Sequence, residues 1–245
     1  MLVKNQTTQK TKPPDELRRL QSGLEKIYSA LKPLQVGAPE QIQRAQKSEG
    51  EAGEKKGKQG EKEKASASEG VDWGKLYRRS VLLHELWNSI EPDVMKRGAR
   101  LDDVEGFEGE LNLLSNKLAK RDRYGSQVAS NNAASLLVKF IQLYGGGVPP
   151  ELLQLRCLVR SVTLKAEKAE WTGAKSDLMK MSSVWSRARS ETEGGDENTK
   201  SKIQYSIDDL NTAVDAKDNI AVMVKGNVLE KNIDLLINSL QKGAK

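Results

Sequence analysis

The sequence is poor in the side chains that build most metal and catalytic centres. Among its 245 residues there are one cysteine, Cys157, and one histidine, His84. These counts exclude an internal disulfide, Cys/His zinc sites and catalysis that needs two histidines. The motifs of serine hydrolases, zinc proteases, kinases and dinucleotide-binding enzymes are also missing. We therefore expect a protein that is not an enzyme, and we predict no cofactor.

Long apolar runs are missing as well. No stretch of the chain approaches the roughly 20 apolar residues that span a bilayer, and residues 1–12 are too polar for a signal peptide. A secreted protein that has been trimmed would show the same pattern. The composition therefore leaves two locations open, outside the cytoplasm in the cell envelope or inside the cytoplasm.

The basic charge of the chain is unevenly distributed. The net charge of +6 divides into +4 over residues 1–34, zero over 35–70 and +2 over 71–245. The part that we expect to fold is thus nearly neutral, whereas a nucleic-acid interface needs a dense basic surface. We expect no nucleic-acid partner.

The chain divides into three regions. Residues 1–34 form an N-terminal arm with a short amphipathic helix over 15–34, which is either a tethered recognition element or a segment that docks on the folded part. Residues 35–70 are predicted to be a disordered, low-complexity linker, because 46–70 lack any aromatic or branched aliphatic residue. Residues 71–245 form the helical-bundle domain.

Apolar residues recur at steps of three and four along this domain, and no segment alternates as a strand does. One such stripe comprises Trp73, Leu76, Ser80, Leu83, Trp87 and Ile90. The pattern predicts an all-α fold, an antiparallel helical bundle of about six helices. Thr172-Gly173 is the expected break if the fourth and fifth helices are separate. The stripes that start at Trp73 and Trp171 are alike, but we find no repeat with a consensus period.

Two sets of residues are candidates for a ligand pocket. Trp73 and Trp87 are spaced by 14 residues, as are Trp171 and Trp185, and the four indoles either wall a pocket or fill the core. The core is the favoured interpretation.

The adjacent Asn131 and Asn132 occupy an otherwise inward part of their helix. One of them is expected to be a buried amide that bonds across the bundle, with a ligand contact as the alternative.

A cation site between the first two helices of the domain would use His84 and Glu108. The paired Glu-x-x-His elements of di-metal bundles are missing, so His84 would supply a single nitrogen ligand. This metal- or haem-binding function is the weakest of our hypotheses. Cys157 is expected to be a small buried residue.

Several segments together resemble uncharacterised helical-bundle lipoproteins of Gram-positive bacteria. The resemblance covers about residues 71–240 and is carried by these segments: the Trp73 to Trp87 spacing, the run from Phe107-Glu108 to Leu114, Tyr144 to Pro150, the Trp171 to Trp185 helix, and Asn232-Ile233-Asp234. It implies a bundle outside the membrane on a lipid-anchored tether, with no known activity. The sequence departs from that plan because it has no lipobox cysteine.

These observations support three hypotheses. The first is a non-enzymatic protein of the bacterial envelope, close to the membrane through a missing anchor, that binds an unknown protein or small ligand. The second is an intracellular scaffold or regulatory protein that docks a partner through helix 15–34. The third is the metal or haem protein that uses His84.

Overall fold

The protein is all-α in the part that the structure describes. The computed structural model describes residues 11–32, 70–145, 148–192 and 196–243, of which 85% are helical and none belongs to a strand. These residues form eight helices, so the expected number of about six was too low. The predicted linker lies outside the described residues apart from Gly70. No helix in the described part is both long enough and apolar enough to cross a membrane.

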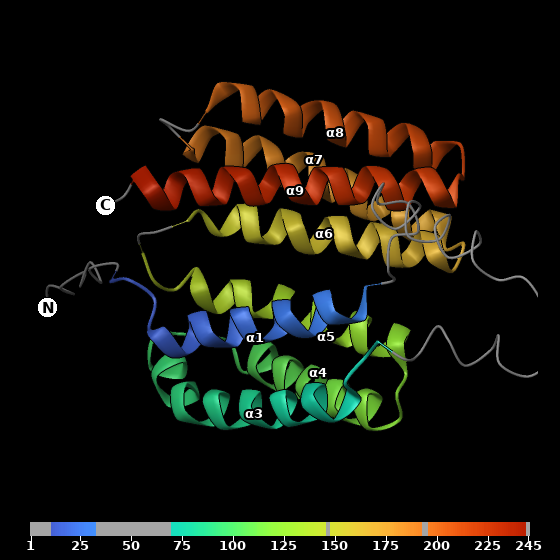
Figure 1. Cartoon of the computed structure of the whole chain (residues 1–245). Coiled ribbons are helices and arrows are strands. Elements are labelled where there is room, and N and C mark those ends of the chain that lie inside the picture. The colour runs from blue at the N-terminus through green and yellow to red at the C-terminus, as the bar shows by residue number, and fades with distance from the viewer. Residues whose placement is uncertain (1–10, 33–69, 146–147, 193–195, 244–245) are drawn as a thin grey trace, which may run out of the picture.

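The helices form two groups of four (Figure 1). The first unit consists of α1 (Asp15–Leu31), α3 (Trp73–Lys96), α4 (Leu101–Ala119) and α5 (Arg123–Ile141). The second unit consists of α6 (Pro150–Glu167), α7 (Trp171–Glu191), α8 (Glu197–Asp215) and α9 (Asn219–Gly243).

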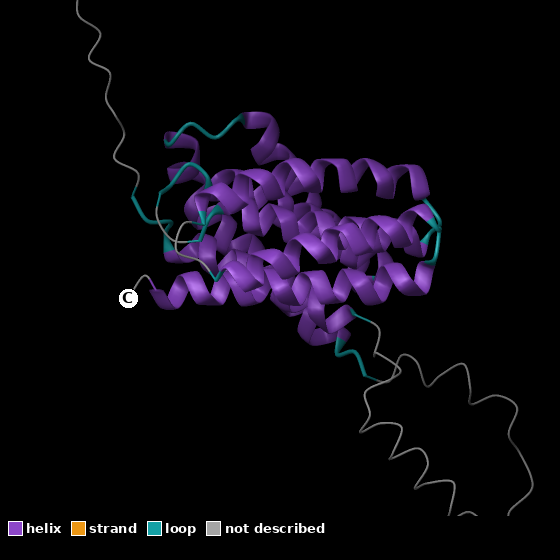
Figure 2. Ribbon diagram, turned by 90° about the horizontal axis from the view of Figure 1, so that it is seen from above, coloured by secondary structure: helices purple, strands orange, loops and turns teal. Residues whose placement is uncertain are grey.

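Each unit closes on itself through the same order of contacts. In the first unit α3 packs on α1, α4 on α3, α5 on α4, and α5 also on α1. The second unit has the same order, from α6 through α7 and α8 to α9 and back to α6. The units meet where α5 packs on α6. Figure 2 shows the long helices lying lengthwise beside one another.

Short turns with a left-handed residue separate consecutive helices. Arg121, Ala169 and Lys217 have φ of 55°, 57° and 54°, and each lies two residues after the end of its helix, α4, α6 and α8 respectively. This conformation ends a helix because it satisfies its last carbonyl groups. The fourth and fifth helices of the domain are therefore separate, and they divide at residues 168–170. Thr172-Gly173, the expected break, lies inside α7.

Helix α1 packs into the core. The segment is therefore docked on the folded part of the protein and is not a tethered recognition element. Five aliphatic side chains of α1 are fully buried: Leu17, Leu20, Leu24, Ile27 and Leu31. They follow the three- and four-residue steps of a helix and face α3 and α5. The division of the chain at residues 34 and 70 stays a prediction, but the first unit is incomplete without α1.

The two units repeat the same buried pattern, position by position. In α4 the buried stripe is Phe107, Leu111, Leu114 and Leu118, and in α8 it is Ile203, Ile207, Leu210 and Val214. Both helices have 19 residues, and each stripe occupies the same places in its helix. In α6 the stripe that matches α1 is Leu152, Leu155, Val159, Val162 and Ala166.

The match extends to motifs outside the core. Both first helices open with the pattern Pro-x-Glu-Leu-x-x-Leu, from Pro14 in α1 and from Pro149 in α6. Both second helices begin at a tryptophan and carry another 14 residues later. The described helices thus repeat one four-helix unit, of which the sequence showed only the likeness of the Trp73 and Trp171 stripes, without a consensus period.

The cores of the two units differ in their aromatic content. Trp87 packs with Phe107 and Phe140 at ring-centroid distances of 4.6 and 5.0 Å. The residues at the corresponding places in the second unit are Trp185 and two aliphatic residues, Ile203 and Leu236. Three rings in contact fill more volume than one ring and two aliphatic side chains, so the first core is the more aromatic of the two.

Candidate functional site

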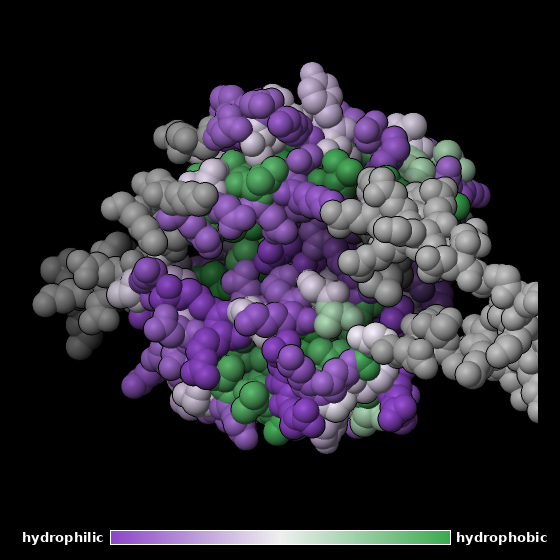
Figure 3. All heavy atoms as spheres, in the orientation of Figure 1, coloured by the Kyte–Doolittle hydropathy of each residue, from purple (hydrophilic) through white to green (hydrophobic). Residues whose placement is uncertain are grey.

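A groove of about 990 Å³ separates α1 from α9, with α6 as its floor. Figure 3 shows this hollow between the two units. Its lining comes from all three helices and from Gln127 of α5. The residues that line it are Glu25, Tyr28 and Ser29 of α1, with Lys32 directly after it; Val159, Arg160, Thr163, Leu164 and Glu167 of α6; and Ile220, Met223, Val224, Gly226, Asn227, Val228, Glu230, Lys231 and Asp234 of α9.

The groove exists because the outward faces of α1 and α6 differ. Besides its core stripe, α6 buries a second line of residues, Leu153, Cys157, Arg160 and Leu164. Side chains of α5 reach the α6 backbone beside this line. Tyr124 Oη donates to the carbonyl oxygen of Leu164 at 3.3 Å, and Asn131 Nδ2 donates to that of Cys157 at 2.9 Å. The side of the molecule formed by α5 and α6 is closed.

The corresponding line on α1 is Arg18, Ser22, Glu25 and Ser29, of which none is buried. Packing these polar side chains against another helix would remove their hydration at a cost in free energy, so they remain in contact with water. Helix α1 therefore does not pack closely on α9, and the groove remains between them.

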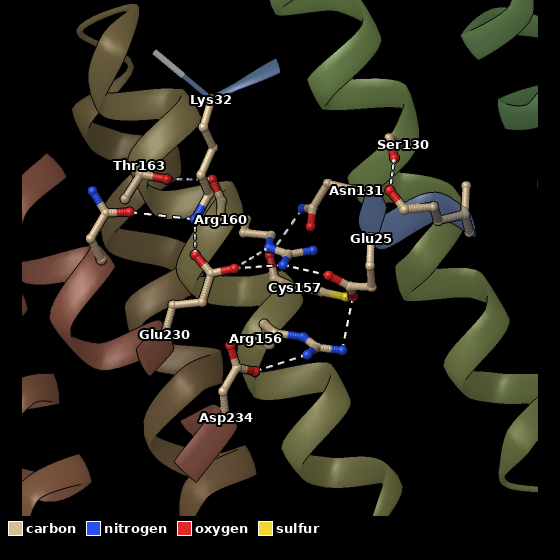
Figure 4. A network of polar contacts seen from close by, with 12 residues as sticks. Glu25, Lys32, Ser130, Asn131, Arg156, Cys157, Arg160, Thr163, Glu230 and Asp234 are labelled. Atoms are coloured by element: carbon tan, nitrogen blue, oxygen red, sulfur yellow. Dashed lines mark hydrogen bonds and ion pairs between the residues drawn. The ribbon is translucent and has the colours of Figure 1, made fainter. Parts of the chain in front are cut away.

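Arg160 is the centre of an ionic network that joins α1, α6 and α9 across the groove (Figure 4). Its side chain is 4% exposed. The guanidinium donates to Glu25 Oε2 at 2.5 Å and, through Nε and Nη2, to Glu230 Oε1 at 2.7 and 2.5 Å. A buried cation with two carboxylate partners is neutralised and tolerable, whereas a single unpaired one is not.

Further ion pairs extend the network at both ends. Lys32 bonds to Glu230 and also lies 3.4 Å from Asn227 Oδ1. Arg156 pairs with Glu25 at 2.8 Å and with Asp234 at 2.9 Å. The six ionised groups are therefore three cations and three anions: Lys32, Arg156 and Arg160, and Glu25, Glu230 and Asp234.

The network sets the protonation of its buried groups. Burial alone would raise the pKa of the Glu230 carboxyl, but Arg160 and Lys32 outweigh it and hold the pKa below its ordinary value. Burial would lower the pKa of Arg160, and the two carboxylates instead raise it. Arg160 and Glu230 therefore both stay charged through the neutral pH range.

Tyr28 forms part of the wall beneath these charges. The Arg160 guanidinium carbon lies 4.2 Å from the centre of its ring, a cation–π contact. Burial raises the pKa of the Tyr28 hydroxyl well above its ordinary value, despite the opposing charge of Arg160. The phenol is therefore protonated and serves as a neutral, rigid surface of the groove.

Cys157, the single cysteine of the chain, is not among the residues that line the groove. Cys157 is buried, and burial raises the pKa of its thiol to about 11, which keeps it protonated. The charged groups nearest the floor are occupied with one another. This arrangement suits recognition of a surface that packs over it.

Comparisons of the chain with family models, with curated proteins and with solved structures find no match. The description of the site therefore rests on the geometry of the chain itself.

The structure places the four candidate tryptophans apart rather than around one cavity. Trp87 and Trp185 are 1% and 2% exposed, each in the core of its own unit. Their indole N–H groups donate to Glu108 and to Gln204, both at 3.0 Å. Trp73 and Trp171 are partly buried at the edge of the core. Trp185 also borders a cavity of about 340 Å³ between α7 and α8, but none of the four lines the groove.

The two candidate asparagines have different roles. Asn131 is the buried amide, and its bond to the Cys157 carbonyl ties α5 to α6, as the structural alternative predicted. Its own Oδ1 has no hydrogen-bond partner within the described structure. Asn132 is exposed and donates to Glu110 at 3.1 Å. Neither residue lines the groove.

The proposed cation pair does not converge on a common point. His84 Nε2 lies 3.0 Å from Ser115 Oγ, and Glu108 accepts from Trp87. The pKa of Glu91 is raised, first by burial and then by the neighbouring Glu108 carboxyl. In the described ranges, no group of three or more His, Cys, Asp or Glu side chains is placed to hold a metal ion.

Sequence reasoning missed the residues of the groove. Glu25, Arg160 and Glu230 come from three distant helices, and each reads by itself as a charge on a solvated face. One signal was present: Arg160 interrupts the second stripe of α6, where Leu153, Cys157 and Leu164 are apolar. A charge within an apolar line points to a buried partner.

Proposed function

We propose that the protein is a non-enzymatic binding protein, and that the groove between α1 and α9 holds its ligand. The observation that carries this proposal is an apolar wall that no described residue covers, beside a network of paired charges. Ile220, Val224 and Val228 line the groove and remain exposed. Exposed apolar side chains that gather at a concave surface are typical of binding sites.

The remaining parts of the proposal come from the sequence. The tether predicted for residues 35–70 and the resemblance to envelope lipoproteins support a location in the bacterial envelope, beside the membrane. The antiparallel order of the helices, which the short turns favour, also belongs to this proposal. Fractionation of cells that express the native gene would test the location.

A scaffold that docks partners through the apolar face of helix 15–34 is less well supported. The apolar face of α1 is packed in the first unit, and its five aliphatic residues have no exposed surface. Docking through this face would require α1 to leave the core. A metal or haem protein is also less well supported, because His84 and Glu108 bond to different partners.

The binding of a fluorescent apolar anion tests the site. Anilinonaphthalene sulfonate, which brightens in apolar surroundings, is expected to bind the native chain. The double variant Val224→Glu/Val228→Glu should lose at least about 10-fold in affinity, because it charges the apolar wall.

The matched control for this experiment is Met179→Glu on α7. Met179 is an apolar residue that is 64% exposed and does not line the groove. Its substitution should leave dye binding unchanged. Equal binding by the native chain and the double variant would refute the groove as the site.

A further inference from the structure

The duplication identifies the surface of α9 that corresponds to the closed side of the molecule. Helix α9 is the counterpart of α5, and both begin with an Asp cap, Asp122 before α5 and Asp218 before α9. The ninth residue of each helix is an asparagine, Asn131 and Asn227. Tyr124 and Asn131 of α5 face α6, and their counterparts Ile220 and Asn227 of α9 line the groove, so this part of the groove wall corresponds to the face of α5 that packs on α6.

On the closed side this face is covered by a helix. The second residue of α5, Tyr124, is half-buried and reaches the α6 backbone at Leu164, and Asn131 reaches it at Cys157. Between them, Val128 is half-buried. The duplicated surface is thus built to receive a helix.

On the open side, the counterparts of Tyr124 and Val128 and the tenth residue of α9 have no cover within the described structure. The counterpart of that tenth residue in α5, Asn132, is exposed on the closed side as well. The second, sixth and tenth residues of α9 are Ile220, Val224 and Val228, with 76%, 56% and 47% of their surfaces exposed. Their spacing of four residues draws one line along the helix, about 12 Å long at a rise of 1.5 Å per residue. That length corresponds to two turns of a partner helix.

Helix α1 does not supply this cover. Its apolar stripe is buried in the first unit. The side chains that line the groove here are polar: Glu25 and Ser29 of α1, and Lys32 directly after it. An apolar line facing polar side chains gains little from contact with them. A molecule that packs on this apolar line of α9 must therefore have an apolar stripe of its own.

We infer that the occupant of the groove is an amphipathic helix of a partner protein, which packs its apolar stripe on Ile220, Val224 and Val228. This inference rests on the proposed function of the groove. Lys231 of α9 and Glu167 of α6 both line the groove and give the incoming helix one cation and one anion to pair with. The mode is a helix in a groove, with anchors at every third or fourth position.

The test uses a fluorescein-labelled designed peptide of about four helical turns with leucines on one face. Fluorescence anisotropy should show binding to the full chain, and Val224→Glu/Val228→Glu should weaken it at least about 10-fold. Met179→Glu should leave it unchanged. A peptide of the same composition with scattered leucines should bind at least about 10-fold more weakly.

The outcomes separate this inference from the proposed function. Binding of the apolar dye without preference for the amphipathic peptide overturns the helix and leaves the groove as a small-ligand site. Failure of both probes overturns both proposals. A concentration-dependent dimer of the native chain that Val224→Glu/Val228→Glu abolishes would assign the surface to a second copy, and would also overturn the inference.

Discussion

The two sides of the molecule start from the same helices and end differently. On one side α5 packs on α6, and on the other α9 stands away from α1 across a groove of about 990 Å³. The helices match in position and in core pattern. The difference comes from outward residues, which are Leu153, Cys157 and Leu164 on α6 but Arg18, Ser22 and Ser29 on α1.

This difference shows that core residues and outward residues determine different features of the structure. The core stripe forms each unit, because burial of apolar area stabilises a helix pair by about 25 cal/mol per Å². The outward line then decides whether one unit packs on the other. A duplicated unit can therefore keep its fold while one of its surfaces becomes a binding site.

The comparison of the two cores gives the largest expected effect. Trp87→Ala should lower the free energy of unfolding by about 4–5 kcal/mol, because it empties a fully packed site and removes two ring contacts. Trp185→Ala should cost about 1 kcal/mol less, since Trp185 has no described ring partner and already borders a cavity. Urea denaturation of both variants measures the difference, and equal losses would show that the aromatic cluster adds nothing.

Removal of Arg160 tests the charges that cross the open side. Arg160→Met should destabilise the chain by about 3 kcal/mol, because Glu25 and Glu230 would lose their shared buried partner. The control is Arg189→Met, which removes an exposed arginine 4.0 Å from Glu197 and should cost less than about 1 kcal/mol. If thermal denaturation shows similar losses for both, the network does not join the units.

The pKa of Glu230 predicts a dependence on pH. It lies below the ordinary value of 4.5, so its stabilising effect is fully present above about pH 4.5 and is lost as the pH falls through the folded value. Glu230→Gln should cost about 2 kcal/mol at neutral pH. The gap between native and variant should narrow below pH 4.5. A gap that stays constant in acid would contradict the ionised state of Glu230.

A matched pair of small residues tests the contact between the last and first helices of each unit. Gly226 in α9 corresponds to Ser130 in α5, which donates to the Leu24 carbonyl at 3.0 Å. A Cβ at Gly226 would lie 2.4 Å from Thr163 Cγ2. Gly226→Ala should therefore cost about 1–2 kcal/mol by overpacking, and Ser130→Ala about 1 kcal/mol by loss of a hydrogen bond.

Thr163→Ser removes the methyl group that Gly226→Ala would strike. The double variant should recover most of the loss in chemical denaturation. No recovery would mean that the cost of Gly226→Ala arises elsewhere.

The smallest effect is expected at the open wall itself. Val224→Glu/Val228→Glu should change the free energy of unfolding by less than about 0.5 kcal/mol per site, because both side chains are largely exposed. A loss comparable to that of Arg160→Met would show that these valines belong to the core of the second unit. In that case they would not form a free wall.

Much of the fold could be predicted, because periodicity records burial directly. Leu76, Leu83, Trp87 and Ile90 were assigned to one helical stripe from sequence, and all four are buried. The helix count was too low because helix 15–34 had been assigned to the arm, and because Ala169, the left-handed residue between α6 and α7, gives no glycine signal.

The duplication and the groove could not be predicted in the same way. Several equivalent core positions carry different side chains, as Phe107 and Ile203 do, and the motifs that the units share are short, so the shared pattern of burial is what aligns the whole units. The groove joins Glu25, Arg160 and Glu230, which lie on separate helices, and no local pattern links residues so far apart in the chain.

The sequence by itself determined which segments are helical and which face of each is buried, because both follow from side-chain spacing along one helix. The tertiary structure alone decided that the helices form two like units, and that these units close on one side and stay open on the other. That outcome depends on which outward faces meet in space, and a buried charge such as Arg160 is stable only where its partners from other helices arrive with it.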